Sequence, residues 1–156
     1  MLDVYKIRKD FPILGKKVNN TDLIYFDNAA TSQTPNQVID VISSYYKENN
    51  SNIHRGLHSL SADATNKYEN SRSIIKNHFG AAHDHEIIFT SGTTHGINII
   101  SSGLEKLISS KDELIVSEME HHSNIVPWQM LCEKTGSKLK VIPINDDGTL
   151  DMDEYK

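Results

Sequence analysis

The sequence is poor in several features that define large classes of protein. It has a single cysteine, Cys132, so an internal disulfide is impossible and a reducing, cytoplasmic setting is predicted. No apolar run approaches the roughly 18 residues of a membrane span, and the charged N-terminus, MLDVYKIRKDFPIL, is not a secretory signal. The net charge is −5, without long runs of either sign, which argues against a nucleic-acid partner. We therefore expect a water-soluble enzyme or interaction domain that binds neither membrane nor nucleic acid.

The first half of the chain predicts helices separated by polar loops. Apolar residues recur at helical spacing in two long stretches, and Gly80 follows the second stretch at a position typical of a helix end. The predicted elements are a short helix over 4–11, a brief strand over 23–27, a helix over 35–49 and a helix over 60–79. We treat residues 1–80 as an N-terminal segment of helices and ligand-facing loops.

The second half alternates short apolar strands with helices, which is typical of βαβ units and a parallel sheet. The predicted strands are 86–90, 113–117 and 139–144, and the predicted helices are 93–108 and 124–136. Because the strands are apolar throughout, helices are expected on both faces of a mostly parallel sheet. The fold class is therefore α/β, with residues 81–156 forming the first part of a larger domain. Asp151 and Glu154 announce a further helix near the last residue, so we expect a cut chain.

The stretch FTSGTTHGIN places a polar, glycine-containing turn between a predicted strand and a predicted helix. The first N–H groups of a helix lack internal partners and carry the positive end of its dipole, so they suit an anion. Thr93 and Thr94 add hydroxyl groups, and Gly92 allows a close approach. The pattern predicts a phosphate-binding loop. The alternative is an ordinary helix cap without a ligand.

Two adjacent histidines, His121 and His122, follow the predicted strand 113–117. Ligands bind at the carboxyl ends of strands in an open parallel sheet, so this pair is expected beside the phosphate-binding loop if the strands 86–90 and 113–117 are neighbours. A histidine there could be an acid or base, a metal ligand or a flat surface for an aromatic cofactor. Histidines that are merely exposed or hydrogen-bonded are the alternative.

Two loops in the first half are further candidates. Ala29 and Ala30, in DNAAT, would leave backbone N–H groups open to a small carboxylate. His54, Arg55 and His58, in IHRGLHS, could bind anions. A metal site is not predicted, because a glycine interrupts the helix that the two histidines would need and no cysteine or acidic partner supports them.

Together, the strings YFDNAATSQTP, NIHRGLHSLS, SGTTHGIN, MEHHSNIVPWQMLC and VIPINDDGTL resemble the N-terminal portion of a SUF-type (group II) cysteine desulfurase. Such enzymes are pyridoxal-phosphate (PLP) enzymes of the class V aminotransferase superfamily and have fold type I. The resemblance covers essentially the whole chain, and MEHHSNIVPWQ makes it specific. It implies removal of sulfur from L-cysteine to give L-alanine and an enzyme persulfide, a homodimeric parent, and a sulfur-acceptor protein of the SUF system for iron–sulfur cluster assembly.

The resemblance also implies roles for individual residues. His121 would stack on the cofactor ring and assist proton transfers, with His122 a structural neighbour. Thr93 and Thr94 would hold the cofactor phosphate, and Ala29 and Ala30 would lie near the substrate carboxylate.

Two features depart from the family's pattern. Ser91 stands where SUF-type relatives often carry arginine, and His95 stands where they often carry glutamate, which puts communication between subunits in doubt. The lysine that binds the cofactor and the cysteine that accepts sulfur are not recognisable here, and Cys132 is interpreted as a core residue. We therefore expect this chain alone to be inactive. A selenocysteine lyase or another class V enzyme, and a non-catalytic module that binds a phosphate-bearing ligand or a partner, remain the alternatives.

Overall fold

The computed structural model describes residues 2–156, which form two compact units. One unit ends at Ile87 and the other comprises Ile88–Lys156. A search of the helices formed by residues 2–156 finds none with the length and apolar character needed to span a bilayer.

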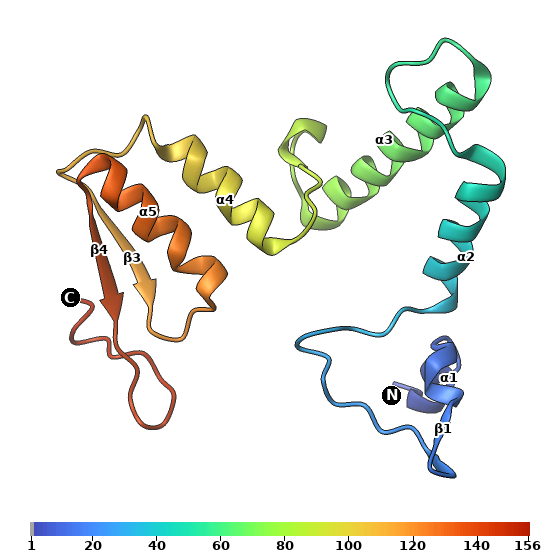
Figure 1. The fold of residues 1–156 in the computed structure, drawn as a ribbon, viewed down its shortest axis with the longest axis horizontal. Coiled ribbons are helices and arrows are strands. Elements are labelled where there is room, and N and C mark those ends of the chain that lie inside the picture. The colour runs from blue at the N-terminus through green and yellow to red at the C-terminus, as the bar shows by residue number, and fades with distance from the viewer. Residues whose placement is uncertain (1) are drawn as a thin grey trace. The chain divides into compact units, whose positions relative to one another are not determined.

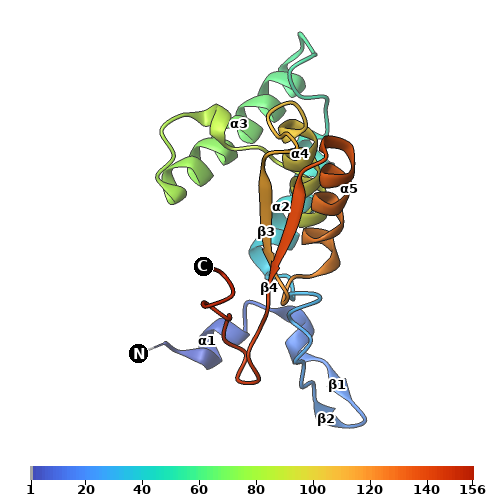
Figure 2. The same cartoon turned by 90° about the vertical axis from the view of Figure 1, so that its left-hand side faces the viewer.

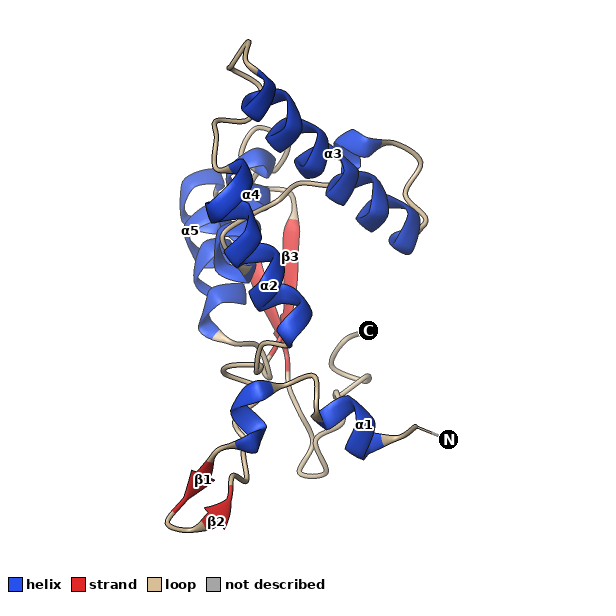
Figure 3. Cartoon of the chain, turned by 90° about the vertical axis from the view of Figure 1, so that its right-hand side faces the viewer, coloured by secondary structure: helices blue, strands red, loops and turns tan. Residues whose placement is uncertain are grey.

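The first unit is mainly helical (Figures 1 and 3). Its elements are α1 (Val4–Arg8), the 3₁₀ helix η1 (Pro12–Gly15), β1 (Lys17–Val18), β2 (Thr21–Asp22), α2 (Asn36–Ser44), the π-helical turn η2 (Tyr45–Asn49), α3 (Ser59–Phe79) and the 3₁₀ helix η3 (Asp84–Glu86). The strands β1 and β2, of two residues each, pair with each other in the antiparallel direction.

The two long helices predicted for this unit are confirmed. α2 and η2 together cover the predicted range to Asn49, with a π-helical last turn. α3 ends at Gly80, whose φ of +69° is the left-handed conformation that glycine adopts without steric cost. The Ala81 N–H then donates to the carbonyl of Lys76 at 3.0 Å, so this end is a Schellman motif. The predicted helix over 4–11 is shorter and stops at Arg8.

Two predicted strands, over 23–27 and 86–90, are wrong. Their β-branched and aromatic residues favour an extended chain, but a strand also needs a hydrogen-bonded ladder with a neighbour. Within residues 2–156 the first segment has only the bond from the Leu23 N–H to the Lys16 carbonyl, at 3.1 Å, and neither segment belongs to a sheet. Residues 84–86 form η3 instead. The carbonyl of Ile87, which a ladder would use, accepts a hydrogen bond from the Arg72 guanidinium of α3.

The second unit contains α4 (Thr93–Leu104), β3 (Glu113–Ser117), the 3₁₀ helix η4 (His122–Asn124), α5 (Val126–Thr135) and β4 (Lys138–Ile142). β3 and β4 are parallel, with Glu113 opposite Lys138 and Ser117 opposite Ile142. Figures 1 and 2 show them side by side, joined through α5. The predicted βαβ unit is confirmed for these two strands, and their carboxyl ends meet at one edge.

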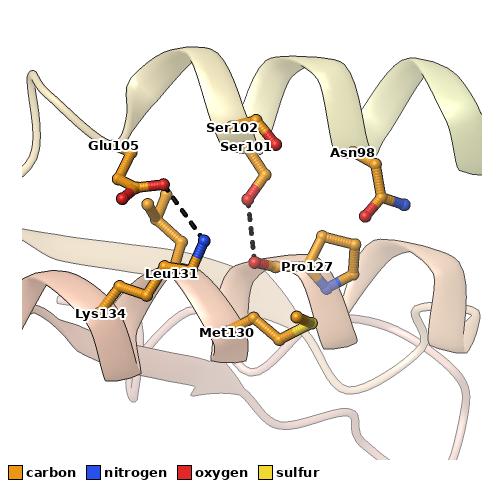
Figure 4. Close-up of a pocket in the computed structure, with 8 residues that line it drawn as sticks. All are labelled: Asn98, Ser101, Ser102, Glu105, Pro127, Met130, Leu131 and Lys134. Carbon is orange, nitrogen blue, oxygen red and sulfur yellow. Dashed lines mark hydrogen bonds and ion pairs between the residues drawn. The ribbon is translucent and has the colours of Figure 1, made fainter.

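The core of this unit lies where α4, α5 and β3 meet. Val116, Leu131 and Cys132 are buried, which confirms Cys132 as a core residue. Ser101 of α4 is also buried, and its hydroxyl donates to the Pro127 carbonyl of α5 at 2.9 Å (Figure 4). By contrast, Ile115 on β3 is 52% exposed. Within this unit, burial is therefore concentrated along the α4–α5 seam.

The predicted start of a helix near residue 151 is present as a single hydrogen-bonded turn. The Asp151 carboxylate accepts from the N–H groups of Asp153 and Glu154, at 3.0 and 3.1 Å, as a helix cap does. Residues 152–155 form only a turn.

Ser101 provides a test of the α4–α5 seam. Replacing Ser101 by alanine removes a buried hydrogen bond between two helices, so we expect a loss of about 1 kcal/mol in the free energy of unfolding. Ser102, the next residue, is exposed and serves as the control, because Ser102→Ala should have little effect. Thermal melting of the full-length protein measures both. Equal effects of the two substitutions would contradict the role given to Ser101.

Candidate functional site

The loop that precedes α4 has an unusual backbone. Gly92 has φ 142° and ψ 175°, a conformation open to glycine and strained for other residues, and it occupies the cap position of α4. No side chain caps this helix among the described residues, although threonines surround the position. The first bond within the helix is donated by Gly96 to the Gly92 carbonyl, at 3.1 Å. The N–H groups before Gly96 therefore have no carbonyl of their own helix to bind.

The hydroxyl groups of this loop divide into two sets. Thr90 donates to the Gly92 carbonyl at 3.1 Å, and Ser91 lies 3.0 Å from Nδ1 of His95, so both are used inside the loop. The hydroxyls of Thr93 and Thr94 make no hydrogen bond to any residue in the described range 2–156, and both residues are exposed. This set of exposed N–H and O–H donors suits an anion.

The loop that follows β3 is held by a chain of side-chain hydrogen bonds. Ser117 and Asn124 each donate to the Glu120 carboxylate at 2.8 Å. The indole N–H of Trp128, on α5, donates to the Asn124 amide oxygen at 2.9 Å. All four residues are half-buried. These hydrogen bonds thus connect the end of β3 to α5 and span the segment that contains the two histidines.

His121 occupies the cap position of η4. The Ser123 N–H donates to His121 Nδ1 at 3.2 Å, which orients the ring and leaves Nε2 without a hydrogen-bond partner among residues 2–156. His122 contacts His121 edge to face, with ring centroids 5.9 Å apart. Both rings are exposed, but only His121 has a hydrogen bond that orients it within the part of the chain that the structure describes.

Hydrogen bonds from Asn124 and Ser117 lower the pKa of Glu120 below its ordinary value. A carboxylate whose pKa is lower in the folded state stabilises the fold above its unfolded pKa, and that contribution is lost as the pH falls through the folded value. We therefore expect Glu120→Gln to melt below the wild type at neutral pH and to approach it as the pH becomes acidic. Melting curves across this range test the expectation, with Glu133→Gln, on the exposed side of α5, as the control. A difference that did not change with pH would contradict it.

The two loops belong to neighbouring elements of one unit, since η4 contacts both α4 and α5. The Ser101 bond to Pro127 fixes the two helices to each other. The crevice between these helices has a volume of about 50 Å³, room for one or two water molecules, so it is a packing seam rather than a cofactor pocket (Figure 4).

Ala29 and Ala30 lie in a turn of the first unit. The Ala30 N–H donates to the Asp27 carbonyl at 3.2 Å, so it is not open to a ligand, contrary to the prediction. The Tyr25 hydroxyl donates to the Asp27 and Thr31 carbonyls, at 3.1 and 2.7 Å, and holds both ends of this turn. Ala29 keeps the expected open N–H among the described residues.

The histidines of the loop over 52–58 have structural partners. His54 Nε2 lies 3.1 Å from the Glu69 carboxylate, and His58 Nδ1 accepts from the Ser61 N–H as the cap of α3. The Ser61 hydroxyl, which is almost fully buried, donates to the Asn52 carbonyl at 2.6 Å. Side chains of α3 therefore hold this loop in place through hydrogen bonds and an ion pair. Residues 2–156 contain no cluster of three or more histidine, cysteine, aspartate or glutamate residues that could hold a metal.

Comparison with known proteins identifies the family. Residues 24–156 match the aminotransferase class-V family. The chain belongs to this family. It is 51% identical over 155 residues to a protein named probable cysteine desulfurase from Staphylococcus epidermidis strain RP62A, and 48% identical to one from Staphylococcus aureus strain Mu50. In each case the match covers 99% of this chain and 38% of the relative. The chain thus spans a little over a third of the relatives' length.

Solved structures of this class V family confirm the fold. An apo cysteine desulfurase from Thermococcus onnurineus NA1 superposes with a TM-score of 0.86 at 40% identity, covering 99% of this chain and 37% of that one. A cysteine desulfurase from Escherichia coli gives a TM-score of 0.78 at 30% identity. The predicted fold class, part of a fold type I PLP-dependent transferase, is confirmed. Class V aminotransferases and cysteine desulfurases depend on PLP.

The sequence analysis missed the hydrogen-bonded residues that flank the two histidines. Glu120, Asn124 and Trp128 stand at spacings of four residues, a separation that brings side chains together on a helical turn. That spacing was the available signal. The contact between His95 and Ser91 was also missed, although each residue was noted separately.

Proposed function

We propose that this chain is the N-terminal part of a SUF-type, PLP-dependent cysteine desulfurase. The parent enzyme removes sulfur from L-cysteine, leaving L-alanine and an enzyme persulfide for iron–sulfur cluster assembly. The observation that carries the proposal is the match along 99% of the chain, at 51% identity, to a protein named as a probable cysteine desulfurase. The likeness to a solved cysteine desulfurase at a TM-score of 0.86 supports it.

The chain's residues fit the phosphate group of PLP. Gly92 leaves open space at the start of α4, the N–H groups beyond it lack partners in their helix, and Thr93 and Thr94 present free hydroxyls. A doubly charged phosphate would gain charge-assisted hydrogen bonds from these donors. Thr93 and Thr94 are therefore assigned to the cofactor phosphate.

His121 is assigned to the cofactor ring and to proton transfer. Bound PLP supplies an electron sink for charge that develops at the α-carbon of an amino acid. The Ser123 N–H fixes the His121 ring, so Nε2 is the atom that can give or take a proton. Ala29 and Ala30 are assigned to the neighbourhood of the substrate carboxylate, where the Ala29 N–H is the donor not used by the turn.

The remaining assignments concern the parent enzyme. Its substrate is L-cysteine, its working form is a homodimer, and a sulfur-acceptor protein of the SUF system receives the sulfur. Residues 1–80 form the N-terminal segment and 81–156 the beginning of the PLP-binding large domain. A cytoplasmic location fits the single buried cysteine, since the cytoplasm keeps thiols reduced.

The test is to express the full-length parent and supply PLP and L-cysteine. Alanine and sulfide are expected in equal amounts in the presence of a reductant, together with absorbance from bound PLP. Selenocysteine is tested in parallel. If the protein turned over selenocysteine but not cysteine, it would be a selenocysteine lyase. If it bound no PLP and turned over neither substrate, it would be a binding module.

The 156-residue chain by itself is expected to release no sulfide from cysteine. It also lacks a well-shielded core, because the buried apolar residues among positions 2–156 are only Ala64, Val116, Pro127, Leu131 and Cys132. Small cores and exposed apolar faces favour association. We expect a weak, non-cooperative melt and aggregation on size-exclusion chromatography. A cooperative melt together with sulfide release would contradict this expectation.

A further inference from the structure

His95 and Ser91 contact each other across the start of α4. Nδ1 of His95 lies 3.2 Å from the Ser91 backbone nitrogen, which donates to it, and 3.0 Å from the Ser91 hydroxyl. His95 is the third residue of α4. A glutamate or glutamine at this position often accepts a hydrogen bond from the backbone just before the helix, as half of a capping box. His95 makes a related contact one residue further upstream, because its imidazole accepts the N–H of Ser91 and not that of the cap residue Gly92.

This contact constrains the backbone just before the N–H groups at the start of α4, which have no partner in their own helix. Gly92 follows Ser91, and glycine has more freedom to leave its observed conformation than any other residue. The side chain of Thr90 holds the Gly92 carbonyl, at 3.1 Å, and His95 holds the Ser91 N–H. No side chain among the described residues caps the N–H groups that follow Gly92. His95 therefore orders the loop without occupying the donors intended for an anion.

We propose that His95 is a positioning residue for the cofactor phosphate. By accepting the Ser91 N–H, it holds the backbone before Gly92 in place and leaves the N–H groups that follow Gly92 for the phosphate. This inference rests on the proposed function and adds to it a residue that does not itself bind the phosphate. A loop ordered before binding loses less conformational entropy when the anion arrives.

The experiment compares PLP with pyridoxal, which lacks the phosphate, as ligands of the full-length apoprotein. Changing His95 to alanine should weaken PLP binding about three- to tenfold, the value of one neutral hydrogen bond, and leave pyridoxal binding unchanged. His95→Gln should restore PLP binding, because a glutamine at the third position of a helix can reach back and accept a backbone N–H just before the helix. His78→Ala, an exposed histidine of α3, is the control and should change neither affinity.

The outcomes separate this inference from the proposed function. If the wild-type protein bound PLP and pyridoxal equally well, the proposed phosphate site itself would be wrong. A wild type that preferred PLP, with the same preference in His95→Ala, would overturn the role of His95 alone. Equal losses for PLP and pyridoxal in His95→Ala, or no rescue by His95→Gln, would also overturn it, since a phosphate-positioning role affects only the phosphate-bearing ligand and needs only the acceptor.

Discussion

Replacing His121 by alanine in the full-length protein is expected to lower the turnover of L-cysteine by roughly 10²- to 10⁴-fold, the usual contribution of a general acid or base. The cofactor should be retained, because the proposed phosphate donors lie on α4 and not on the loop after β3. The measurement is steady-state sulfide release, together with the absorbance of bound PLP after dialysis.

A second substitution separates chemistry from structure. His121 Nδ1 also caps η4 by accepting the Ser123 N–H, so alanine removes both a proton-transfer group and a cap. Asparagine is among the best capping residues but cannot transfer protons near neutral pH. His121→Asn should therefore restore the melting temperature and leave the enzyme inactive. Recovery of activity in this variant would show that the ring acts only as a cap.

His122 provides the matched control. Its side chain has no hydrogen bond to any residue within 2–156, and its ring meets the His121 ring edge to face. His122→Ala should lower turnover by no more than a fewfold. An inactive His122→Ala protein beside a nearly normal His121→Ala protein would reverse the assignment of the pair.

Elements that depend on local signals could be predicted from the sequence. The apolar stripe over 60–79 and the glycine at position 80 gave α3 to within one residue, because both act within a few residues of chain. The strand at 113–117 was predicted at its observed bounds, since it finds β4 inside the same unit. The segment over 86–90 has a similar apolar composition, but composition cannot show whether a neighbouring strand exists.

The candidate site divides in the same way. An anion-binding position at the start of α4 was predicted from a strand-like segment, a glycine and two threonines in a row. The structure confirms that a helix starts at Thr93, and the anion itself stays a prediction. The open N–H of Ala30 was predicted wrongly, because a turn closed by Asp27 cannot be read from two alanines. Similarly, Ser91 and His95 were recognised as two separate departures from a family pattern. Their direct contact depends on side-chain geometry that the pattern does not contain.

Replacing both Thr93 and Thr94 by alanine is expected to have the other large effect, on cofactor binding. Both hydroxyls are exposed and make no hydrogen bond to any residue in the described range 2–156, while the neighbouring hydroxyls of Thr90 and Ser91 are used inside the loop. A hydrogen bond to a charged group contributes about 1.5–3 kcal/mol, so losing two should weaken PLP binding by roughly two to four powers of ten. Titration of the full-length apoprotein with PLP measures this loss.

The matched control keeps the hydroxyls and removes only the methyl groups. Thr93→Ser combined with Thr94→Ser should bind PLP nearly as the wild type does, because serine offers the same O–H donor at the same positions. The backbone N–H groups of α4 remain in both double variants, so the alanine protein should retain weak phosphate selectivity over pyridoxal. If the alanine variant bound PLP normally, the phosphate would have to be held elsewhere. If the serine variant lost PLP as well, the threonines would act through packing of the first turn, and the assignment of their hydroxyls to the phosphate would be wrong.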